Sequence, residues 1–231
     1  MIIGINGKIG SGKDTIGSII QYLTANDVGS DCIKRVRGGL SVYGYHNSKW
    51  EVKKFAGKLK IIASILTGIP IEKFEDQEFK KTILGEEWGI VKDHPMNHIP
   101  VFEDVKFNHL MSVRELLQKL GTEAMRDGLH QNVWVNALMC DYRRPKMSEP
   151  NPSNWVITDV RFPNELAAVN DVNGLTIRVV RPQIETANFK PQHPSETALD
   201  DAEFDYEIIN DGSLEDLIAK VRQILITEKI I

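Results

Sequence analysis

The feature that most constrains this chain is a glycine-rich stretch near its start, Gly7-Lys8-Ile9-Gly10-Ser11-Gly12-Lys13. An apolar run at residues 2–6 precedes it. Apolar side chains then recur at the spacing of one helix face, at Ile16, Ile19, Ile20 and Leu23. Glycines let the backbone turn tightly and direct several N–H groups at phosphate oxygens, and the following helix N-terminus adds a favourable dipole. The pattern predicts a nucleotide-phosphate loop in which Lys13 reaches the β- and γ-phosphates. The alternative is a glycine-rich turn with a purely structural role.

The rest of the chain alternates strand and helix patterns. Short β-branched or apolar runs predict strands at 50–55, 155–158, 175–180 and 206–209. Helical spacing predicts helices at 59–66, 110–120, 131–142, 165–169 and 214–225, the last capped by Ser213. We expect loops at 29–49 and 145–154, an insertion at 70–109 and a polar, proline-interrupted segment at 181–205. This alternation indicates an α/β fold with a largely parallel sheet covered on both faces.

Composition excludes several classes of protein. The 231 residues carry 28 basic and 32 acidic side chains, a net charge of −4, which disfavours nonspecific nucleic-acid or membrane binding. Two cysteines exclude a disulfide framework and a multi-cysteine metal site, so we expect a reducing compartment. Neither a signal peptide nor a run of 18 apolar residues is evident, so we expect no membrane partner.

Two acidic residues are candidates for binding Mg²⁺. The phosphate-loop pattern expects Ser or Thr after its lysine, but Asp14 stands there and Thr15 follows. Asp14 could bind the metal, since hard cations accept carboxylates, or only favour the helix dipole. Asp159 is expected at the carboxyl end of a buried strand, where ligands bind in open α/β sheets. It could organise Mg²⁺ or cap the next turn.

Cationic side chains at strand ends and helix starts suggest a second, phosphorylated substrate. A phosphomonoester is mostly dianionic near neutral pH, its second pKa being about 6, so it attacks without a strong base. The obstacle is bringing two polyanions together, which requires cations and exclusion of water. The candidates are Lys60, Arg114, Arg126, Arg161 and Arg181, although any one of them could be a solvated surface charge. His193 and Glu196 lie in the polar segment, and a lone histidine is usually structural or exposed.

Several short motifs, taken in their order along the chain, resemble those of the deoxynucleoside monophosphate kinases encoded by tailed bacteriophages. The matching stretches are 10–15 (GSGKDT), 55–60 (FAGKLK), 112–123 (SVRELLQKLGTE), 134–135, Asp159 to Arg161 with Asn164 and Glu165, 179–182, His193 with Glu196, and 210–215 (NDGSLE). They span almost the whole chain, and the Lys-Asp-Thr ending of the loop fits the same family.

The resemblance implies transfer of the ATP γ-phosphate to a deoxynucleoside monophosphate with Mg²⁺, giving a diphosphate for DNA precursor supply. It implies one P-loop kinase domain over 1–231, three layers with a five-stranded parallel sheet, a monophosphate-binding insertion at about 70–109 and a lid at about 181–205. Gly7 to Thr15 would bind ATP, Lys13 and Arg161 would be catalytic, and Asp14 and Asp159 would hold the metal. Lys60, Arg114 and Arg161 would grip the acceptor phosphate, with Arg181 in the lid region.

The resemblance also sets expectations about partners and leaves rival functions open. We expect ATP and a deoxynucleoside monophosphate as partners, no nucleic acid, and allow for a homodimer in the cytoplasm, that of an infected host cell if a phage encodes the chain. The rival enzyme is another small-molecule P-loop kinase, such as a phosphomevalonate kinase. A GTPase switch would need an Asn/Thr-Lys-x-Asp motif, which the sequence lacks. A binding module with a degenerate loop is disfavoured by the intact Lys13.

Overall fold

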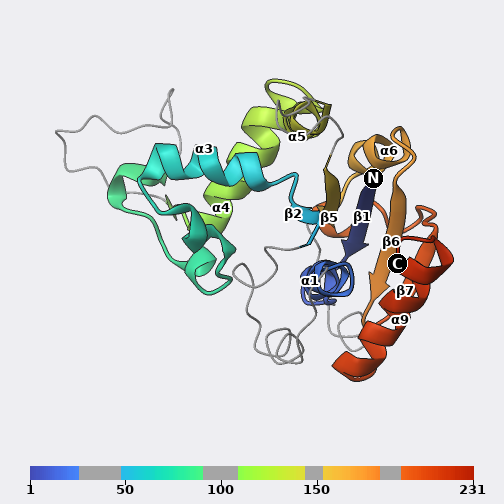
Figure 1. Ribbon diagram of the computed structural model, residues 1–231. Coiled ribbons are helices and arrows are strands. Elements are labelled where there is room, and N and C mark those ends of the chain that lie inside the picture. Colours follow the sequence, from blue (N-terminus) through green and yellow to red (C-terminus); the bar gives the residue numbers. More distant parts are fainter. Residues whose placement is uncertain (26–47, 91–108, 144–152, 183–193) are drawn as a thin grey trace. The chain divides into compact units, whose positions relative to one another are not determined.

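A five-stranded, all-parallel sheet organises the part of the chain that carries the glycine-rich loop (Figure 1). The computed structural model describes residues 1–25, 48–90, 109–143, 153–182 and 194–231. The strands are β1 (Ile2–Gly7), β2 (Trp50–Lys53), β5 (Asn154–Val160), β6 (Leu175–Val180) and β7 (Tyr206–Ile209). Their order, β2-β5-β1-β6-β7, places β1 at the centre, so the loop that follows β1 leaves from the middle of the sheet.

Helices cover both faces of this sheet, which confirms the three-layer α/β fold. Helices α1 (Lys13–Leu23) and α9 (Leu214–Thr227) pack on one face, where apolar side chains of both helices and of the strands form the core. Helix α6 (Pro163–Asn170) lies against the other face, with Val169 over Gly4 of β1. Helix α5 (Val133–Arg143) brings Tyr142 edge-on to Trp155 of β5. Among the described residues, no helix combines the length and apolar character needed to cross a membrane.

The chain divides into two compact units. One consists of Met1–Phe55 and Val135–Ile231, and the other is Ala56–Trp134. The insertion expected at 70–109 lies within the second unit, which extends beyond it in both directions along the chain. That unit contains α3 (Gly57–Thr67), three 3₁₀ turns at Ile71–Glu75, Phe79–Lys81 and Glu86–Trp88, the β3–β4 pair (Gly89–Ile90 and His109–Leu110), α4 (Val113–Gln118) and a π-helix at Lys119–Asp127.

The second unit has its own small apolar core. Ala63, Phe74 and Val113 are buried there and are surrounded by partly buried apolar side chains. The indole of Trp134 donates to the carbonyl of Gly121 at 2.9 Å, so a buried polar group is satisfied. Trp134 of this unit and Trp155 of β5 are both buried, whereas Cys140 on α5 is exposed.

One helix start differs from expectation and another is as expected, each for a local reason. The helix expected at 110–120 begins only at Val113, because Ser112 accepts a hydrogen bond from the backbone N–H of Glu115 and caps it. Residues before Ser112 instead form strand β4. The Ser213 cap of α9 is confirmed: Ser213 and Asp216 form a reciprocal capping box.

The carboxyl end of β5 is irregular where it passes β1. Gly4 pairs with Ile157 and Asn6 with Val160, so two steps along β1 oppose three along β5. Such a bulge turns side chains in new directions and is common beside functional sites. Asp159 lies at the carboxyl end of this strand, as expected, where it is the penultimate residue of β5 and part of the bulged stretch.

Close contact between α1 and β5 depends on Gly17. A Cβ at this position would lie 2.7 Å from Cγ2 of Thr158. Because helix α1 carries Lys13 and Asp14 at its start, this approach fixes how near the loop end lies to the carboxyl end of β5. Gly17 therefore allows α1 to pack closely on β5 beside the site described below.

The end of the polar segment after β6 is anchored to the sheet. Arg178 of β6 donates to the carbonyls of Leu199, Asp200 and Ala202, and Asp205 accepts from the backbone and hydroxyl of Thr176. Leu199 is buried. Most of the expected loops at 29–49 and 145–154, positions 91–108 of the insertion and 183–193 of the lid lie outside the described residues. The lid at 181–205 remains a prediction, with its last seven residues tied to β6.

Candidate active site

The glycine-rich loop joins the central strand β1 to helix α1 and takes conformations that only glycine adopts easily. Gly10 and Gly12 have φ values of 82° and 103°, in the region that side chains disfavour. Nδ2 of Asn210, at the end of β7, donates to the carbonyl of Ser11 at 2.8 Å. A Cβ on Gly12 would lie 2.6 Å from that same Nδ2. The loop is thus held at the helix N-terminus in a shape that presents backbone N–H groups.

The loop contains one buried polar atom that supports a phosphate-binding role. Among the described residues, Ser11 Oγ is buried without a hydrogen-bond partner. A Cβ on Gly7 would lie 2.5 Å from this oxygen, so a side chain at Gly7 would crowd it. A buried hydroxyl with no partner is costly unless a ligand supplies one. The donors and conformations of this loop therefore fit the phosphates of a nucleotide.

Lys13 is the buried cation of the site. It is only 8% exposed, and Nζ donates to the carbonyl of Lys8 at 3.2 Å, which folds its side chain back along the loop. Burial lowers the pKa of Lys13, and Arg161 lowers it further, while Asp14 and other carboxylates oppose the shift. A poorly solvated ammonium at a helix start attracts anions strongly, because little water screens it.

Asp14 begins helix α1 beside Lys13 and is held by two neighbours. Its Oδ1 accepts from Thr158 Oγ1 at 2.6 Å and lies 3.3 Å from Nζ of Lys54. Partial desolvation raises the pKa of Asp14, but the Lys54 ammonium, the Thr158 hydroxyl and Lys13 outweigh it, so the pKa lies below its ordinary value. Asp14 is therefore a carboxylate at neutral pH, as a metal ligand must be.

Asp159 provides a second carboxylate from the bulge of β5. It is 8% exposed and accepts from the backbone N–H of Phe55 at 2.8 Å. The described residues contain no cluster of three or more His, Cys, Asp or Glu that could hold a metal alone. Mg²⁺ commonly takes one or two carboxylates and completes its shell with phosphates and water. The carboxylates of Asp14 and Asp159 are the ones here that could take part in such a shell.

Arg161 follows directly after β5 and is fixed at both backbone and side chain. The buried carboxylate of Glu165 accepts from its backbone N–H at 2.8 Å, which shapes the turn into α6. The guanidinium pairs with Glu196 through Nη1. Glu196 in turn accepts from the backbone N–H of Ile9, in the phosphate loop, at 3.0 Å.

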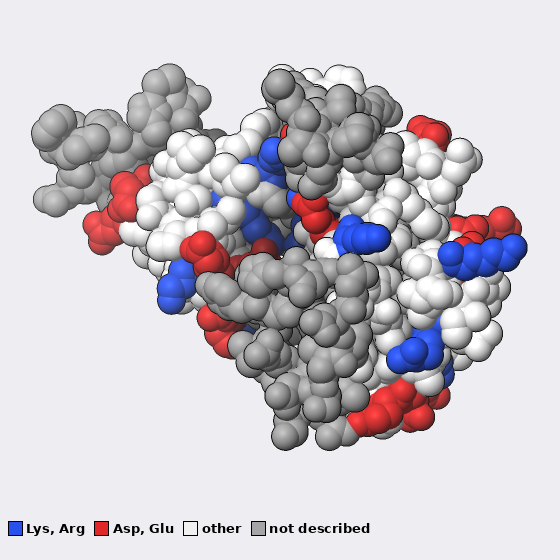
Figure 2. Space-filling model, in the orientation of Figure 1, with Lys and Arg blue, Asp and Glu red and all other residues white. Residues whose placement is uncertain are grey.

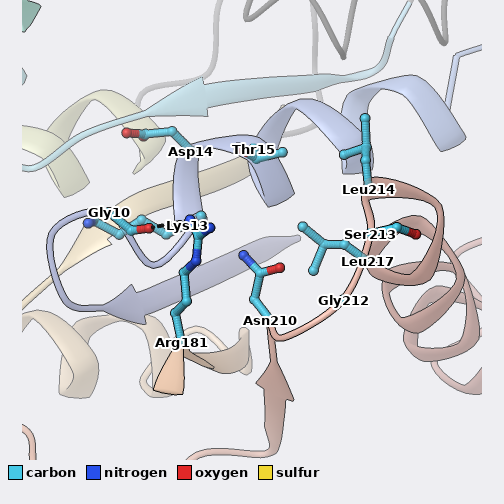
Figure 3. A pocket seen from close by; sticks show the side chains of 11 residues that line it. Gly10, Lys13, Asp14, Thr15, Arg181, Asn210, Gly212, Ser213, Leu214 and Leu217 are labelled. Atoms are coloured by element: carbon cyan, nitrogen blue, oxygen red, sulfur yellow. Dashed lines mark hydrogen bonds between the residues drawn. The ribbon is translucent and has the colours of Figure 1, made fainter. Parts of the chain in front are cut away.

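A pocket of about 400 Å³ opens beside the loop (Figure 3). It lies between the start of α1, the end of β6 and the turn from β7 into α9. Arg181 extends toward the loop and donates to the carbonyl of Gly10 at 3.3 Å, with Asn210 beside it and Leu214 and Leu217 on the α9 side. The pocket thus joins the glycine-rich loop and the Arg181 guanidinium to an apolar wall.

Comparisons with known proteins identify the family. A model of the family described as deoxynucleotide monophosphate kinase matches residues 60–221. The chain belongs to the deoxynucleotide monophosphate kinase family. It is 28% identical over 246 residues to the deoxynucleoside-5′-monophosphate kinase of Escherichia phage T5, covering 91% of this chain and 89% of that one. The deoxynucleotide monophosphate kinase of Escherichia phage RB69 is 32% identical over 118 residues, 51% of this chain and 46% of its own. That of Enterobacteria phage T4 is 32% identical over 114 residues, with 49% and 45% covered.

For this family member, one unit brings together most of the residues predicted from the sequence. Gly7 to Thr15, Asp159, Arg161 and Arg181 all belong to the unit built on the five-stranded sheet. Lys60 and Arg114 belong to the second unit. There, buried Lys60 pairs with Glu75 at 2.5 Å and Arg114 donates to Gln77 at 3.2 Å, so both contact one short segment. His193 lies outside the described residues.

Four contributors to the site were not predicted as site residues. Lys54 and Thr158 bind Asp14, Asn210 supports the loop, and Glu196 joins the loop to Arg161. Asn210 and Lys54 each directly follow a predicted strand or lie at its end, which is the signal that could have singled them out. Arg126, one of the candidates for binding the second substrate, is buried in the second unit.

Proposed function

We propose that the loop from Gly7 to Thr15 binds the triphosphate of ATP and that Lys13 and Arg161 stabilise the phosphoryl group during its transfer to a deoxynucleoside monophosphate. The chain is a deoxynucleotide monophosphate kinase, an ATP-dependent phosphotransferase that acts on nucleotides. The observation that carries the proposal is the loop between β1 and α1, with left-handed glycines and buried Lys13. Backbone N–H groups and an ammonium in one turn are the groups that stabilise the charge a triphosphate develops during transfer.

The residues need to supply charge and geometry rather than proton transfer. The acceptor phosphate is mostly dianionic at neutral pH, with a second pKa of about 6, so it needs no strong general base. Lys13 and Arg161 would offset the charge of the two phosphates as they approach. Bound Mg²⁺ would supply further positive charge on the phosphates. Asp14 and Asp159 are the residues that would hold it, and the low pKa of Asp14 keeps that carboxylate ionised.

The pocket beside Arg181 supports an assignment for the rest of ATP. Its walls combine the Arg181 guanidinium, the Asn210 amide and the apolar side chains of Leu214 and Leu217. A nucleoside offers a flat apolar base with polar edges, which suits such a lining. We therefore assign the adenosine of ATP to this pocket and the acceptor monophosphate to a separate place.

The function can be tested with a panel of deoxynucleoside monophosphates, ATP and Mg²⁺, read out as ADP formed, with phosphomevalonate in a parallel reaction. ADP formation with at least one deoxynucleoside monophosphate and none with phosphomevalonate is expected. Turnover of phosphomevalonate alone would assign the chain to the rival class, which the family match does not favour.

A change at Asp14 tests the metal assignment. Replacing Asp14 with Asn should raise the Mg²⁺ concentration needed for half-maximal rate by about tenfold, because a neutral amide is a weaker ligand. The matched control is Asp216→Asn, since Asp216 is also an acidic residue in the first turn of a helix. An Asp14→Asn variant with the Mg²⁺ requirement of Asp216→Asn would leave Asp14 as a helix-start residue only.

A change at Arg114 tests the acceptor assignment. Replacing Arg114 with Ala should raise KM for the deoxynucleoside monophosphate by about tenfold and leave KM for ATP within about twofold, because only the acceptor phosphate loses a cation. Arg222→Ala, an exposed arginine on α9, serves as the control. Equal damage to both KM values would show that Arg114 is misplaced in this scheme.

The expected partners complete the proposal. Figure 2 shows both basic and acidic side chains on one face of the described residues. The proposed partners are ATP and a deoxynucleoside monophosphate, with no nucleic acid among them. A homodimer, a lid at 181–205 and a cytoplasmic location remain parts of the proposal. Size-exclusion chromatography with light scattering would establish the assembly.

A further inference from the structure

Glu196 is an acidic residue that none of the predicted roles includes. It lies in the short helix α8 (Pro194–Thr197), and its side chain is only 12% exposed. A carboxylate this deeply placed is stable only when other groups satisfy its charge and its lone pairs. Its partners therefore indicate what it does.

Both oxygens of this carboxylate bind residues of the phosphate-transfer site. Oε2 accepts the backbone N–H of Ile9 at 3.0 Å, and Oε1 pairs with Nη1 of Arg161. One side chain thus joins the phosphate loop after β1 to the arginine after β5. Neither partner is near Glu196 in the sequence, being 187 and 35 positions away.

Fixing Arg161 matters because a free arginine side chain has many conformations. Ordering such a side chain at the moment of phosphate binding or transfer is entropically unfavourable, whereas a pre-oriented one has less freedom to lose. A guanidinium has five N–H donors in a planar fork, so a bond through Nη1 leaves donors for a phosphate. The Arg161 side chain, 28% exposed, is therefore held in place while N–H donors of its guanidinium stay available for a phosphate.

We infer that Glu196 is a positioning residue for phosphoryl transfer, whose carboxylate holds the Arg161 guanidinium against the phosphate loop. This inference rests on the proposed function, in which Arg161 acts on the transferred phosphoryl group. The two contacts of the carboxylate, with the backbone N–H of Ile9 and with Nη1 of Arg161, are the observations that carry it.

A purely structural role for Glu196 is less consistent with the packing of its segment. The residues that follow are already anchored by Arg178 and by the Asp205–Thr176 bonds, and Leu199 is buried. The same segment also approaches the loop through Asp200, whose Oδ1 lies 4.0 Å from Nζ of Lys8. Removing the charge of Glu196 therefore leaves these anchors in place.

Glu196→Gln separates the two contacts of the carboxylate. The amide oxygen of Gln can still accept from Ile9, but its NH₂ group cannot pair with a guanidinium. We expect kcat for the best deoxynucleoside monophosphate to fall by about tenfold or more, with KM for ATP within about threefold, because the loss falls on the transition state. An unchanged kcat, or a change confined to KM for ATP, would overturn the inference.

A double-mutant cycle with Arg161→Ala shows whether Glu196 acts through Arg161. If it does, Glu196→Gln should change kcat by less than about twofold in the Arg161→Ala background. A loss of the same factor in both backgrounds would overturn the inference and assign Glu196 a structural role. If Glu196→Gln shows no cooperative thermal unfolding, Glu196→Asp replaces it. The shorter Asp side chain keeps the charge but no longer reaches Arg161. The decrease in kcat caused by Glu196→Asp must likewise disappear in the Arg161→Ala background.

Asp200→Asn is the matched control, because Asp200 also connects this segment to the loop but through a long ion pair with an exposed carboxylate. Its kcat should stay within about twofold of the unmodified protein, since exposed ion pairs contribute little. The unmodified protein separates the two hypotheses. If it phosphorylates a deoxynucleoside monophosphate while Glu196→Gln is unaffected, only the inference fails; if it phosphorylates none, the proposed function fails.

Discussion

Replacing Lys13 with Ala should lower kcat for deoxynucleoside monophosphate phosphorylation by about a thousandfold, equivalent to about 4 kcal/mol of transition-state stabilisation. The effect is large because the Lys13 ammonium is buried at the start of α1, where water screens its charge poorly. Its interaction is strongest when negative charge moves between the two phosphates. Quenched-flow or coupled ADP assays at saturating substrates would measure the loss.

The fold should survive this change. Burial holds the pKa of Lys13 below the value it has in the unfolded chain. At a pH between these two pKa values, Lys13 is therefore protonated more often in the unfolded chain than in the folded one. Stability of the unmodified protein therefore rises with pH through that window, and at neutral pH the charged Lys13 opposes folding. The variant loses this penalty along with some packing, so its free energy of unfolding should change by less than about 1 kcal/mol. Lys81→Ala, an exposed lysine, is the activity control, and turnover of Lys13→Ala within tenfold of that control would contradict the assignment.

Replacing Gly12 with Ala should destabilise the protein by about 2–4 kcal/mol and weaken ATP binding about a hundredfold. Two effects combine at this position. An alanine at φ 103° is strained, and its Cβ would lie 2.6 Å from the Asn210 amide that supports the loop. Relief of the clash must move either the loop or Asn210, and both positions determine where the backbone N–H groups point. Chemical denaturation and calorimetric titration with ATP would measure the two quantities.

Two other glycines separate strain from clash. Gly68 ends α3 with φ 70° and has open space around its Cβ position, so Gly68→Ala carries strain alone and should cost about 1 kcal/mol. Gly57, with neither positive φ nor close neighbours, should change stability by less than about 0.5 kcal/mol. ATP affinity should stay unchanged in both. If Gly12→Ala behaved like Gly57→Ala in stability and ATP binding, the loop would not have the role described.

Local patterns in the sequence predicted most elements of the sheet unit. The alternation of apolar strands with helical stripes indicated the parallel sheet, and Ser213 marked the start of α9 correctly. The strand order and the bulge at Asp159 were not predicted, because both depend on which strands pair. The second unit was harder to interpret, since its short 3₁₀ turns and the π-helix after α4 have no strong periodicity.

The site shows the same division between local and long-range information. The loop from Gly7 to Lys13 is continuous in sequence, so its spacing alone indicated a phosphate-binding turn. The contact of Asp14 with Thr158 joins residues 144 positions apart, and that of Ile9 with Glu196 joins residues 187 positions apart. Such pairs become neighbours only through the topology of the sheet. The pattern of charged residues in the sequence therefore indicated candidate site residues but not which of them contact each other.

The tight approach at Gly17 has a consequence for how this family could diversify. The methyl group of Thr158 touches the space beside Gly17, while the hydroxyl of the same threonine binds Asp14. A bulkier side chain at Gly17, which contacts no nucleotide in this scheme, would push on one side of Thr158 and reorient the carboxylate on the other. Selection acting on interior packing one turn along α1 could thereby retune metal preference without altering any ligand.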